Sequence, residues 1–170
     1  MKSNVMLSPS LLSADFSNLA GAVGTIKENS GSLVHIDVMD GHFVPQVTYG
    51  QPVIASVRKC TDLPFDVHLM VEHPESSISS YIDAGADWIT FHIEATCHAD
   101  RCVQIIHERG KKAGIALCPA TPVAASASTA ADNSAFCAFS YAASSAAAAF
   151  ASSICALTSA FLASSSSTVC

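Results

Sequence analysis

The chain has 170 residues, which is long enough for one domain with a buried core. Its formal net charge of −6 argues against nucleic acid as the main partner. Seven cysteines are scattered without a Cys-x-x-Cys pair, and Pro9 comes too soon after Met1 for the apolar core of a signal peptide. We therefore expect reduced thiols and a cytoplasmic location.

Before Val123 the sequence alternates between short strands and helices. Strands are predicted at Val5–Leu7, Val34–Val38, Phe65–Leu69, Trp88–Phe91 and Gly114–Leu117. Helices are predicted at about Asn18–Glu28, about Gln51–Lys59, Pro74–Ala84 and about Ala99–Glu108. Strand starts recur about every thirty residues, which is the size of a βα unit. The pattern predicts a parallel sheet covered by helices.

The strand around Ile36 carries polar side chains on one face. Because side chains two apart on a strand point the same way, His35, Asp37 and Met39 share a face. An unpaired polar group that is buried costs about 2–7 kcal/mol, so this imidazole and carboxylate require a metal, a substrate or a polar network. An isolated His-x-Asp pattern more often reflects a hydrogen bond within the core than a functional site, and that interpretation stays open.

A second strand repeats the pattern, with Asp66, His68 and Met70 on one face. Two strands of one sheet that each carry an imidazole at a similar depth can form half of a metal site. Imidazole and carboxylate together suit Zn²⁺, Fe²⁺, Mn²⁺ or Co²⁺, and the spacing does not choose among them. The two strands therefore indicate one divalent metal ion of undetermined identity.

The composition changes after Val123. All eight Gly, all seven Pro and all eight Lys and Arg lie before residue 124, and Asp132 is the single charged residue beyond it. We therefore divide the chain into residues 1–123 and an Ala/Ser-rich, low-complexity tail over residues 124–170. Three explanations are open for the tail: misread or frameshifted sequence, a truncated paralogue with a disordered tail, and a membrane anchor over residues 134–163. The anchor has the weakest support, because the segment contains few strongly apolar residues.

Five segments together carry a family resemblance. They are Leu7–Phe16, Val34–Pro45, Asp66–Val71, Ile89–Ala95 and Cys118–Pro122. In order and spacing they resemble the ribulose-phosphate 3-epimerase family over residues 5 to 123, whereas residues 124–170 do not. The family usually has Asn where this chain has Cys118.

The resemblance implies a (β/α)8 TIM barrel of the ribulose-phosphate-binding type, with about the first five βα units recognisable. Its active site is expected at the C-terminal ends of the strands. It also implies a metal-dependent isomerase of the pentose phosphate pathway, which interconverts D-ribulose 5-phosphate and D-xylulose 5-phosphate. One carboxylate removes the C3 proton to give an enediolate, a second carboxylic acid returns a proton from the other face, and a divalent metal stabilises the developing oxyanions.

By resemblance, His35, Asp37 and His68 bind the metal, and Asp37 is also one of the two acid/base groups. Ser10 is expected to bind the substrate, and His68 is expected to lie against it. The phosphorylated sugar is the expected ligand, and a homo-oligomer is the expected assembly.

Three further residues are candidates for the site. Met39 and Met70 could cap the enediolate with polarizable thioethers, although simple core filling explains them equally well. His92 ends the fourth predicted strand and could border the substrate. It is not assigned to the metal.

Some parts of the family pattern have no counterpart after Val123. The second catalytic aspartate, which is also the fourth metal ligand, follows the family's seventh strand, and the phosphate site uses loops after the sixth and eighth strands. Here only Asp132 follows, without Gly, Lys or Arg. Efficient turnover by these residues alone is therefore not expected. A hexulose-phosphate 3-epimerase on the same barrel and a catalytically inactive barrel fragment stay open as alternatives.

Overall fold

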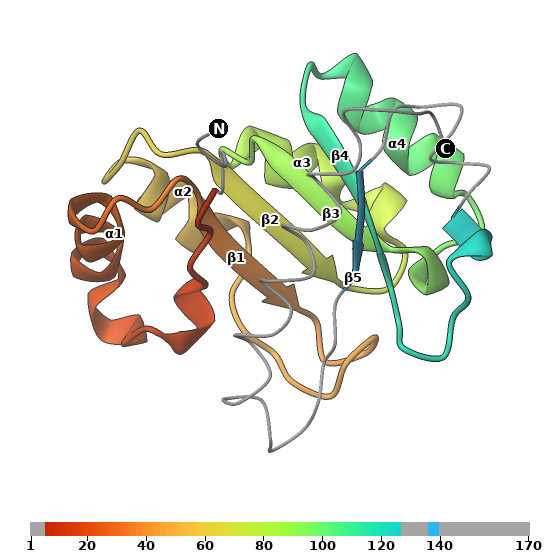
Figure 1. Cartoon of the computed structure of the whole chain (residues 1–170), viewed down its shortest axis with the longest axis horizontal. Helices are drawn as coiled ribbons and strands as arrows, with labels where there is room; N and C mark the ends of the chain where they lie inside the picture. Colours follow the sequence, from red (N-terminus) through yellow and green to blue (C-terminus); the bar gives the residue numbers. More distant parts are fainter. Residues whose placement is uncertain (1–5, 127–135, 140–170) are drawn as a thin grey trace, which may run out of the picture.

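The computed structural model describes residues 6–126 and 136–139, and the structural statements below refer to these residues. Its centre is a five-stranded parallel sheet in the order β1-β2-β3-β4-β5 (Figure 1). The strands are β1 (Val34–Met39), β2 (Phe65–Met70), β3 (Trp88–His92), β4 (Lys112–Leu117) and β5 (Phe136–Phe139). Parallel neighbours need crossover connections, and helices supply them here as in the first part of a (β/α)8 barrel.

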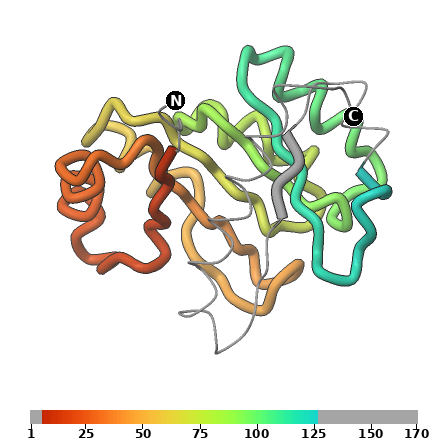
Figure 2. Tube along the Cα trace, in the orientation of Figure 1, coloured from red at the N-terminus to blue at the C-terminus, as the bar shows by residue number. Residues whose placement is uncertain are grey.

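Four α-helices form the connecting layer: α1 (Leu19–Glu28), α2 (Gln51–Arg58), α3 (Ile78–Asp83) and α4 (Ala99–Glu108). Four short 3-10 turns accompany them: η1 (Leu11–Ser13), η2 (Phe16–Asn18), η3 (Pro74–Ser76) and η4 (Ile93–Ala95). The chain progresses from α1 at one side of the molecule to α4 at the other (Figure 2). The predicted bounds of α4 are confirmed, and those of α1 and α2 differ by one residue each.

The helix predicted over Pro74–Ala84 is wrong as a single element, because it divides into η3 and α3. Ser77 separates them with φ −120° and ψ −17°, outside the helical region. The hydroxyl of Ser76 donates to the carbonyl of His73 at 2.7 Å, and that of Ser80 donates to the carbonyl of Ser77 at 2.7 Å. Local hydroxyl bonds of this kind compete with the helical ladder, which explains the interruption.

The first predicted strand, Val5–Leu7, is not a strand in the described part of the chain, which begins at residue 6. The segment still follows β1, since the carbonyl of Leu7 accepts from the N–H of Leu33 at 3.1 Å and that of Pro9 accepts from His35 at 3.0 Å. Pro9 has no N–H, so it cannot extend a regular ladder. The sheet therefore gains an irregular edge in place of the expected strand.

The fifth strand lies beyond the point where the composition changes. β5 pairs in parallel with β4, from Gly114 opposite Phe136 to Leu117 opposite Phe139. The sheet therefore continues past Val123 in the order of a barrel. The division at residue 123 and the three explanations of the tail stay predictions, because most of residues 124–170 lie outside the described part.

No helix in the described residues is long and apolar enough to cross a membrane. The candidate anchor over residues 134–163 lies almost wholly outside the described residues.

The two faces of the sheet differ as the alternation in the sequence predicts. One face is apolar and packs against the helices in a single buried core, in which Ile36, Leu69 and Phe91 are almost fully buried. On the other face, the register pairs His35 with Asp66, Asp37 with His68, and Met39 with Met70. Paired residues of a parallel sheet share a face, so the polar side chains of β1 and β2 lie together.

Asp87 joins the N-terminal ends of three strands, β2, β3 and β4. Its carboxylate accepts the N–H of Phe65 at 3.0 Å and the ammonium of Lys111 at 2.9 Å, and it lies 3.3 Å from the guanidinium of Arg58. Burial alone would raise the pKa of Asp87, but Lys111, the Phe65 N–H and Arg58 outweigh it and lower the pKa below the ordinary 3.8. The ionised carboxylate therefore stabilises the folded state.

Asp87→Asn is expected to lower the free energy of unfolding by about 1–2 kcal/mol at pH 7. Because the folded pKa is the lower one, this stabilisation is present above about pH 4 and is lost as the pH falls through the folded pKa. Urea unfolding at pH 7 and at acid pH measures the effect. Asp62→Asn is the control, since Asp62 pairs with Lys27 at 3.2 Å with both side chains mostly exposed. Equal losses in both variants would contradict the assignment.

Candidate functional site

Ser10, His35, Asp37 and His68 converge on the polar face of the sheet, along the middle of β1 and β2. The donor atoms of His35, Asp37 and His68 all lie within 4.8 Å of one another. Ser10 pairs with His35 through an isolated parallel bridge, and its hydroxyl donates to Oδ2 of Asp37. The structure thus brings together all four residues that the resemblance selects as metal ligands or substrate contacts.

His35 is held between two carboxylates. Its Nε2 lies 3.2 Å from Oδ1 of Asp37, and its Nδ1 lies 2.8 Å from Oδ2 of Asp66. Burial alone would lower the pKa of His35, but these two carboxylates outweigh it and raise the pKa to about 10. Asp66 fixes the ring so that Nε2 faces Asp37, a support that metal-binding histidines commonly have.

Asp37 is the centre of the cluster and is 9% exposed. Besides its contacts with His35 and Ser10, its Oδ1 lies 3.3 Å from Nδ1 of His68. Burial would raise the pKa of Asp37, but the hydrogen bonds from His35, His68 and Ser10 hold it well below its usual range. The carboxylate is therefore ionised at neutral pH.

The donor set of this cluster fits a divalent transition metal. Nε2 of His35, Nδ1 of His68 and a carboxylate oxygen of Asp37 face one another, and two imidazoles with one carboxylate suit Zn²⁺, Fe²⁺, Mn²⁺ or Co²⁺. Metal ligands must be deprotonated, so a metal ion bound here would displace a proton from His35.

His92, the last residue of β3, extends the cluster. It is 3% exposed, and its Nε2 lies 3.0 Å from Nε2 of His68, with the two rings stacked at a centroid distance of 5.0 Å. The ring of Phe43, from the loop after β1, lies 4.9 Å from that of His92. Burial and the neighbouring His68 lower the pKa of His92 to about 4. His92 is thus a neutral imidazole in contact with a candidate metal ligand.

Met39 and Met70 end β1 and β2 and are paired in register on the face of the cluster. Met70 is 3% exposed, whereas Met39 is half-buried. Their position at the strand ends agrees both with a contact to substrate and with core filling, so their role stays a prediction.

Two residues of the site were missed by sequence reasoning. Glu94, in η4, accepts the N–H of Cys118 through Oε1 at 2.7 Å, and its Oε2 lies 3.4 Å from Nδ1 of His92. The Sγ of Cys118 lies 3.7 Å from the same nitrogen. The sequence marks these two residues only weakly. Each follows the end of a buried strand by one or two positions, and the active-site residues of barrels commonly lie there.

The loops after β1 and β2 are tied together by Asp40. Its carboxylate accepts the N–H groups of His42 at 2.8 Å, Phe43 at 3.0 Å and Glu72 at 2.9 Å. Burial would raise the pKa of Asp40, but these backbone donors lower it. The ionised side chain therefore fixes the loop that carries Phe43 against His92.

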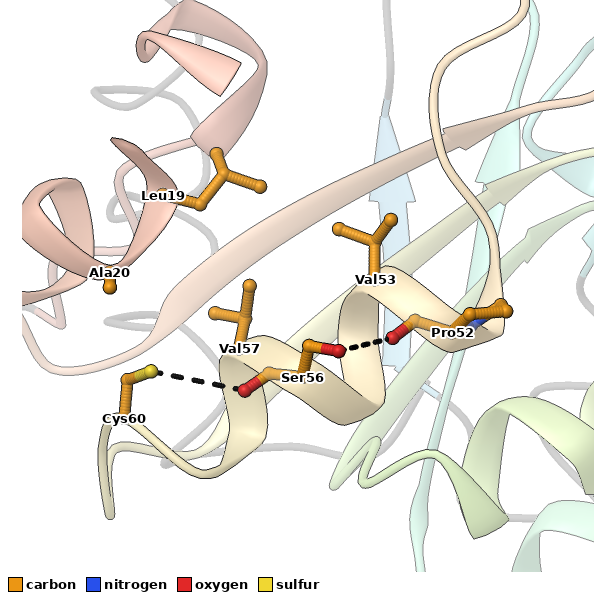
Figure 3. A pocket seen from close by; sticks show the side chains of 7 residues that line it. All are labelled: Leu19, Ala20, Pro52, Val53, Ser56, Val57 and Cys60. Carbon is orange, nitrogen blue, oxygen red and sulfur yellow. Dashed lines mark hydrogen bonds between the residues drawn. The ribbon is translucent and has the colours of Figure 1, made fainter. Parts of the chain in front are cut away.

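A groove of about 430 Å³ lies elsewhere, in the helical layer between α1 and α2. Figure 3 shows its lining, which is Leu19, Ala20, Pro52, Val53, Ser56, Val57 and Cys60. This layer covers the apolar face of the sheet, whereas the polar cluster is on the other face. The groove offers no charged side chain, and we do not assign the chemistry to it.

The chain that carries this cluster is similar in sequence to known proteins. The chain is 54% identical to the ribulose-phosphate 3-epimerase of Treponema pallidum over 125 residues, which are 74% of this chain and 57% of that protein. It is 47% identical to the ribulose-phosphate 3-epimerase of Bacillus subtilis over 119 residues, or 70% of this chain and 55% of that protein. The chain thus spans about half the length of the curated relatives it matches.

Among solved structures, variants of the tryptophan synthase alpha-subunit of Pyrococcus furiosus resemble the chain. One has a TM-score of 0.61 at 13% identity, covering 86% of this chain and 69% of that chain. Another has a TM-score of 0.58 at 12% identity, covering 80% and 64%. At this identity the likeness shows the fold alone, part of a (β/α)8 barrel.

The model of the ribulose-phosphate 3 epimerase family matches residues 6–156. This range includes β5 and extends beyond residue 123, where the sequence resemblance was expected to end, so that expectation is corrected. With the polar cluster on the sheet and relatives at up to 54% identity, the match shows that the chain belongs to the ribulose-phosphate 3-epimerase family.

Proposed function

We propose that this chain epimerises C3 of a ketopentose phosphate, interconverting D-ribulose 5-phosphate and D-xylulose 5-phosphate. The observation that carries the proposal is the convergence of His35, Asp37 and His68 on one face of the neighbouring parallel strands β1 and β2. This face continues to Met39 and Met70 at the C-terminal ends of the two strands, which is the end where barrel enzymes place their chemistry. The relatives that share these segments are named for this epimerisation.

In this proposal Asp37 is one of the two acid/base groups. Its low pKa keeps the carboxylate ionised, and the hydroxyl of Ser10 and the two imidazoles fix its orientation. A carboxylate in this state can accept the proton from C3 of a bound substrate. Ser10 is also proposed to contact the substrate once its hydroxyl turns away from Asp37, and His68 to lie against it.

We further propose that His35, Asp37 and His68 hold one divalent metal ion. When bound, the ion supplies positive charge beside the oxygens at C2 and C3, which become negative as the C3 proton leaves. Asp66 supports the ring of His35, and His92 contacts the ring of His68. Met39 and Met70 are proposed to border the substrate on the same face.

We also propose a homo-oligomer in the cytoplasm. Large apolar side chains are exposed in the N-terminal segment and in the loop after β1, namely Met6, Leu7, Leu12, Phe16 and Val47. Such surface commonly marks a contact between subunits. The cysteines at 60, 97, 102 and 118 are free thiols, in keeping with a reducing compartment. Light scattering of the purified chain, together with fractionation of cells, tests both points.

A coupled assay with D-ribulose 5-phosphate and with a hexulose phosphate tests the function. Weak turnover of the pentulose substrate alone is expected, since Asp132 is the single charged residue after Val123, and Asp37→Asn should lower it about 10²–10⁴-fold because it removes an acid/base group. Asp62→Asn, an exposed carboxylate elsewhere, should leave it unchanged. Preference for the hexulose phosphate would favour that alternative. Sugar phosphate binding without turnover would favour the catalytically inactive fragment.

A further inference from the structure

Three side chains with different donor atoms meet beyond the first cluster, at the C-terminal ends of β3 and β4. They are His92 at the end of β3, Glu94 in η4 and Cys118 directly after β4. Their nitrogen, oxygen and sulfur donors all lie within 4.8 Å of one another. His92 is buried, and Glu94 is fixed by the N–H of Cys118, so the group is held by the sheet rather than by a loop tip.

The spacing of these donors is that of ligands around a single ion. With bonds of about 2.0–2.3 Å to a tetrahedral zinc ion, an imidazole nitrogen lies about 3.5 Å from a thiolate sulfur and about 3.3 Å from a carboxylate oxygen. In the structure, Nδ1 of His92 lies 3.7 Å from Sγ of Cys118 and 3.4 Å from Oε2 of Glu94. Only small movements would place all three around one ion.

We propose that His92, Glu94 and Cys118 form a second cation site, distinct from that of His35, Asp37 and His68, which takes a thiophilic divalent ion such as Zn²⁺. Sulfur, imidazole and carboxylate donors together favour Zn²⁺, Co²⁺ or Cd²⁺ over Mg²⁺ or Mn²⁺. Binding releases the thiol proton of Cys118 to solvent, since a coordinating thiol is deprotonated. The three ligands leave a fourth position for water or another small ligand.

The second site is coupled to the first through two imidazoles. The Nε2 atoms of His68 and His92 are 3.0 Å apart, so one of them carries the hydrogen that they share. When Nδ1 of His92 binds an ion, its Nε2 carries the hydrogen and donates to Nε2 of His68. A neutral His68 then carries its own hydrogen on Nδ1, the atom that faces Asp37. Occupation of the second site therefore weakens ion binding at the first, and the effect is reciprocal.

Titration of the full chain with Co²⁺ tests the site, because thiolate bound to Co²⁺ gives a charge-transfer absorption in the near ultraviolet. The first cluster has no cysteine, so this absorption distinguishes the second site from the first. We expect one equivalent of thiolate-bound Co²⁺ in the native chain. Cys118→Ser should abolish the absorption, and Glu94→Gln should weaken Co²⁺ binding at this site at least about tenfold. Circular dichroism establishes that each variant is folded.

Two control variants separate this site from other thiols and from the first site. Cys97→Ser removes an exposed thiol between η4 and α4 and should leave the absorption intact. His35→Ala weakens the first site, so the absorption should appear at the same or a lower Co²⁺ concentration. The proposal is overturned if the native chain shows no thiolate absorption, if Cys118→Ser retains it, or if His35→Ala abolishes it. None of these outcomes depends on epimerase turnover.

Discussion

Replacing His68 by alanine is expected to lower the affinity of the chain for Zn²⁺, Mn²⁺ and Co²⁺ at the first site at least about 100-fold. Loss of a residue that merely supports a ligand typically costs about 10–100-fold in metal affinity, and loss of a ligand costs more. His68 presents Nδ1 at 3.3 Å from Asp37 and is buried, so neighbouring side chains cannot easily replace it. Competition with a chromophoric chelator measures the affinity, and elemental analysis after gel filtration measures the bound metal.

His73→Ala is the matched control. His73 lies just after β2, but its side chain is 77% exposed and pairs with Glu75 at 3.4 Å. An exposed pair of this kind contributes little, so both affinity and folding should stay as in the native chain. Mn²⁺ is the most informative ion, because the thiolate of the second site disfavours it. Native Mn²⁺ affinity in His68→Ala would refute the assignment of the first site.

The polar face of the sheet could be predicted because it depends on a local rule. Side chains alternate along a strand, so His35 and Asp37 had to share a face, as did Asp66 and His68. The bounds of α4 were predicted from a local signal too, since Gly110 stands where a glycine commonly follows the end of a helix. The support of His35 by Asp66, in contrast, depends on the register of β1 and β2, which pairs these two residues.

The second cluster could not be predicted, because it depends on how neighbouring strands are aligned. Glu94 and Cys118 are 24 residues apart in sequence, and they meet since His92 pairs with Ala116 in the register of β3 and β4. No local pattern in the sequence fixes that register. The error at Val5–Leu7 has a different origin: an apolar segment next to a proline follows the sheet edge without forming a ladder.

Gly114→Ala is expected to lower the free energy of unfolding by about 1–3 kcal/mol, because it overpacks the polar face of the sheet. Gly114 is opposite Thr90 in the register of β3 and β4, and a Cβ at Gly114 would lie 2.4 Å from Oγ1 and 3.2 Å from Cβ of Thr90. Thr90 is β-branched and has few alternative rotamers. It is itself opposite His68, so the displaced side chain would press toward the first cluster.

Two comparisons isolate this contact from the general effect of replacing glycine. Gly24→Ala in α1 adds a Cβ with nothing within 4 Å, so it should stabilise the chain by about 0.5–1 kcal/mol through the helix propensity of alanine. In the double variant Thr90→Ala with Gly114→Ala, the 2.4 Å contact disappears while the 3.2 Å contact stays. The cost of Gly114→Ala in a Thr90→Ala background should therefore be smaller than in the native chain. Chemical unfolding of the four variants and the native chain measures the free energy of unfolding of each. An equal cost of Gly114→Ala in both backgrounds would show that the side chain of Thr90 does not cause the destabilisation.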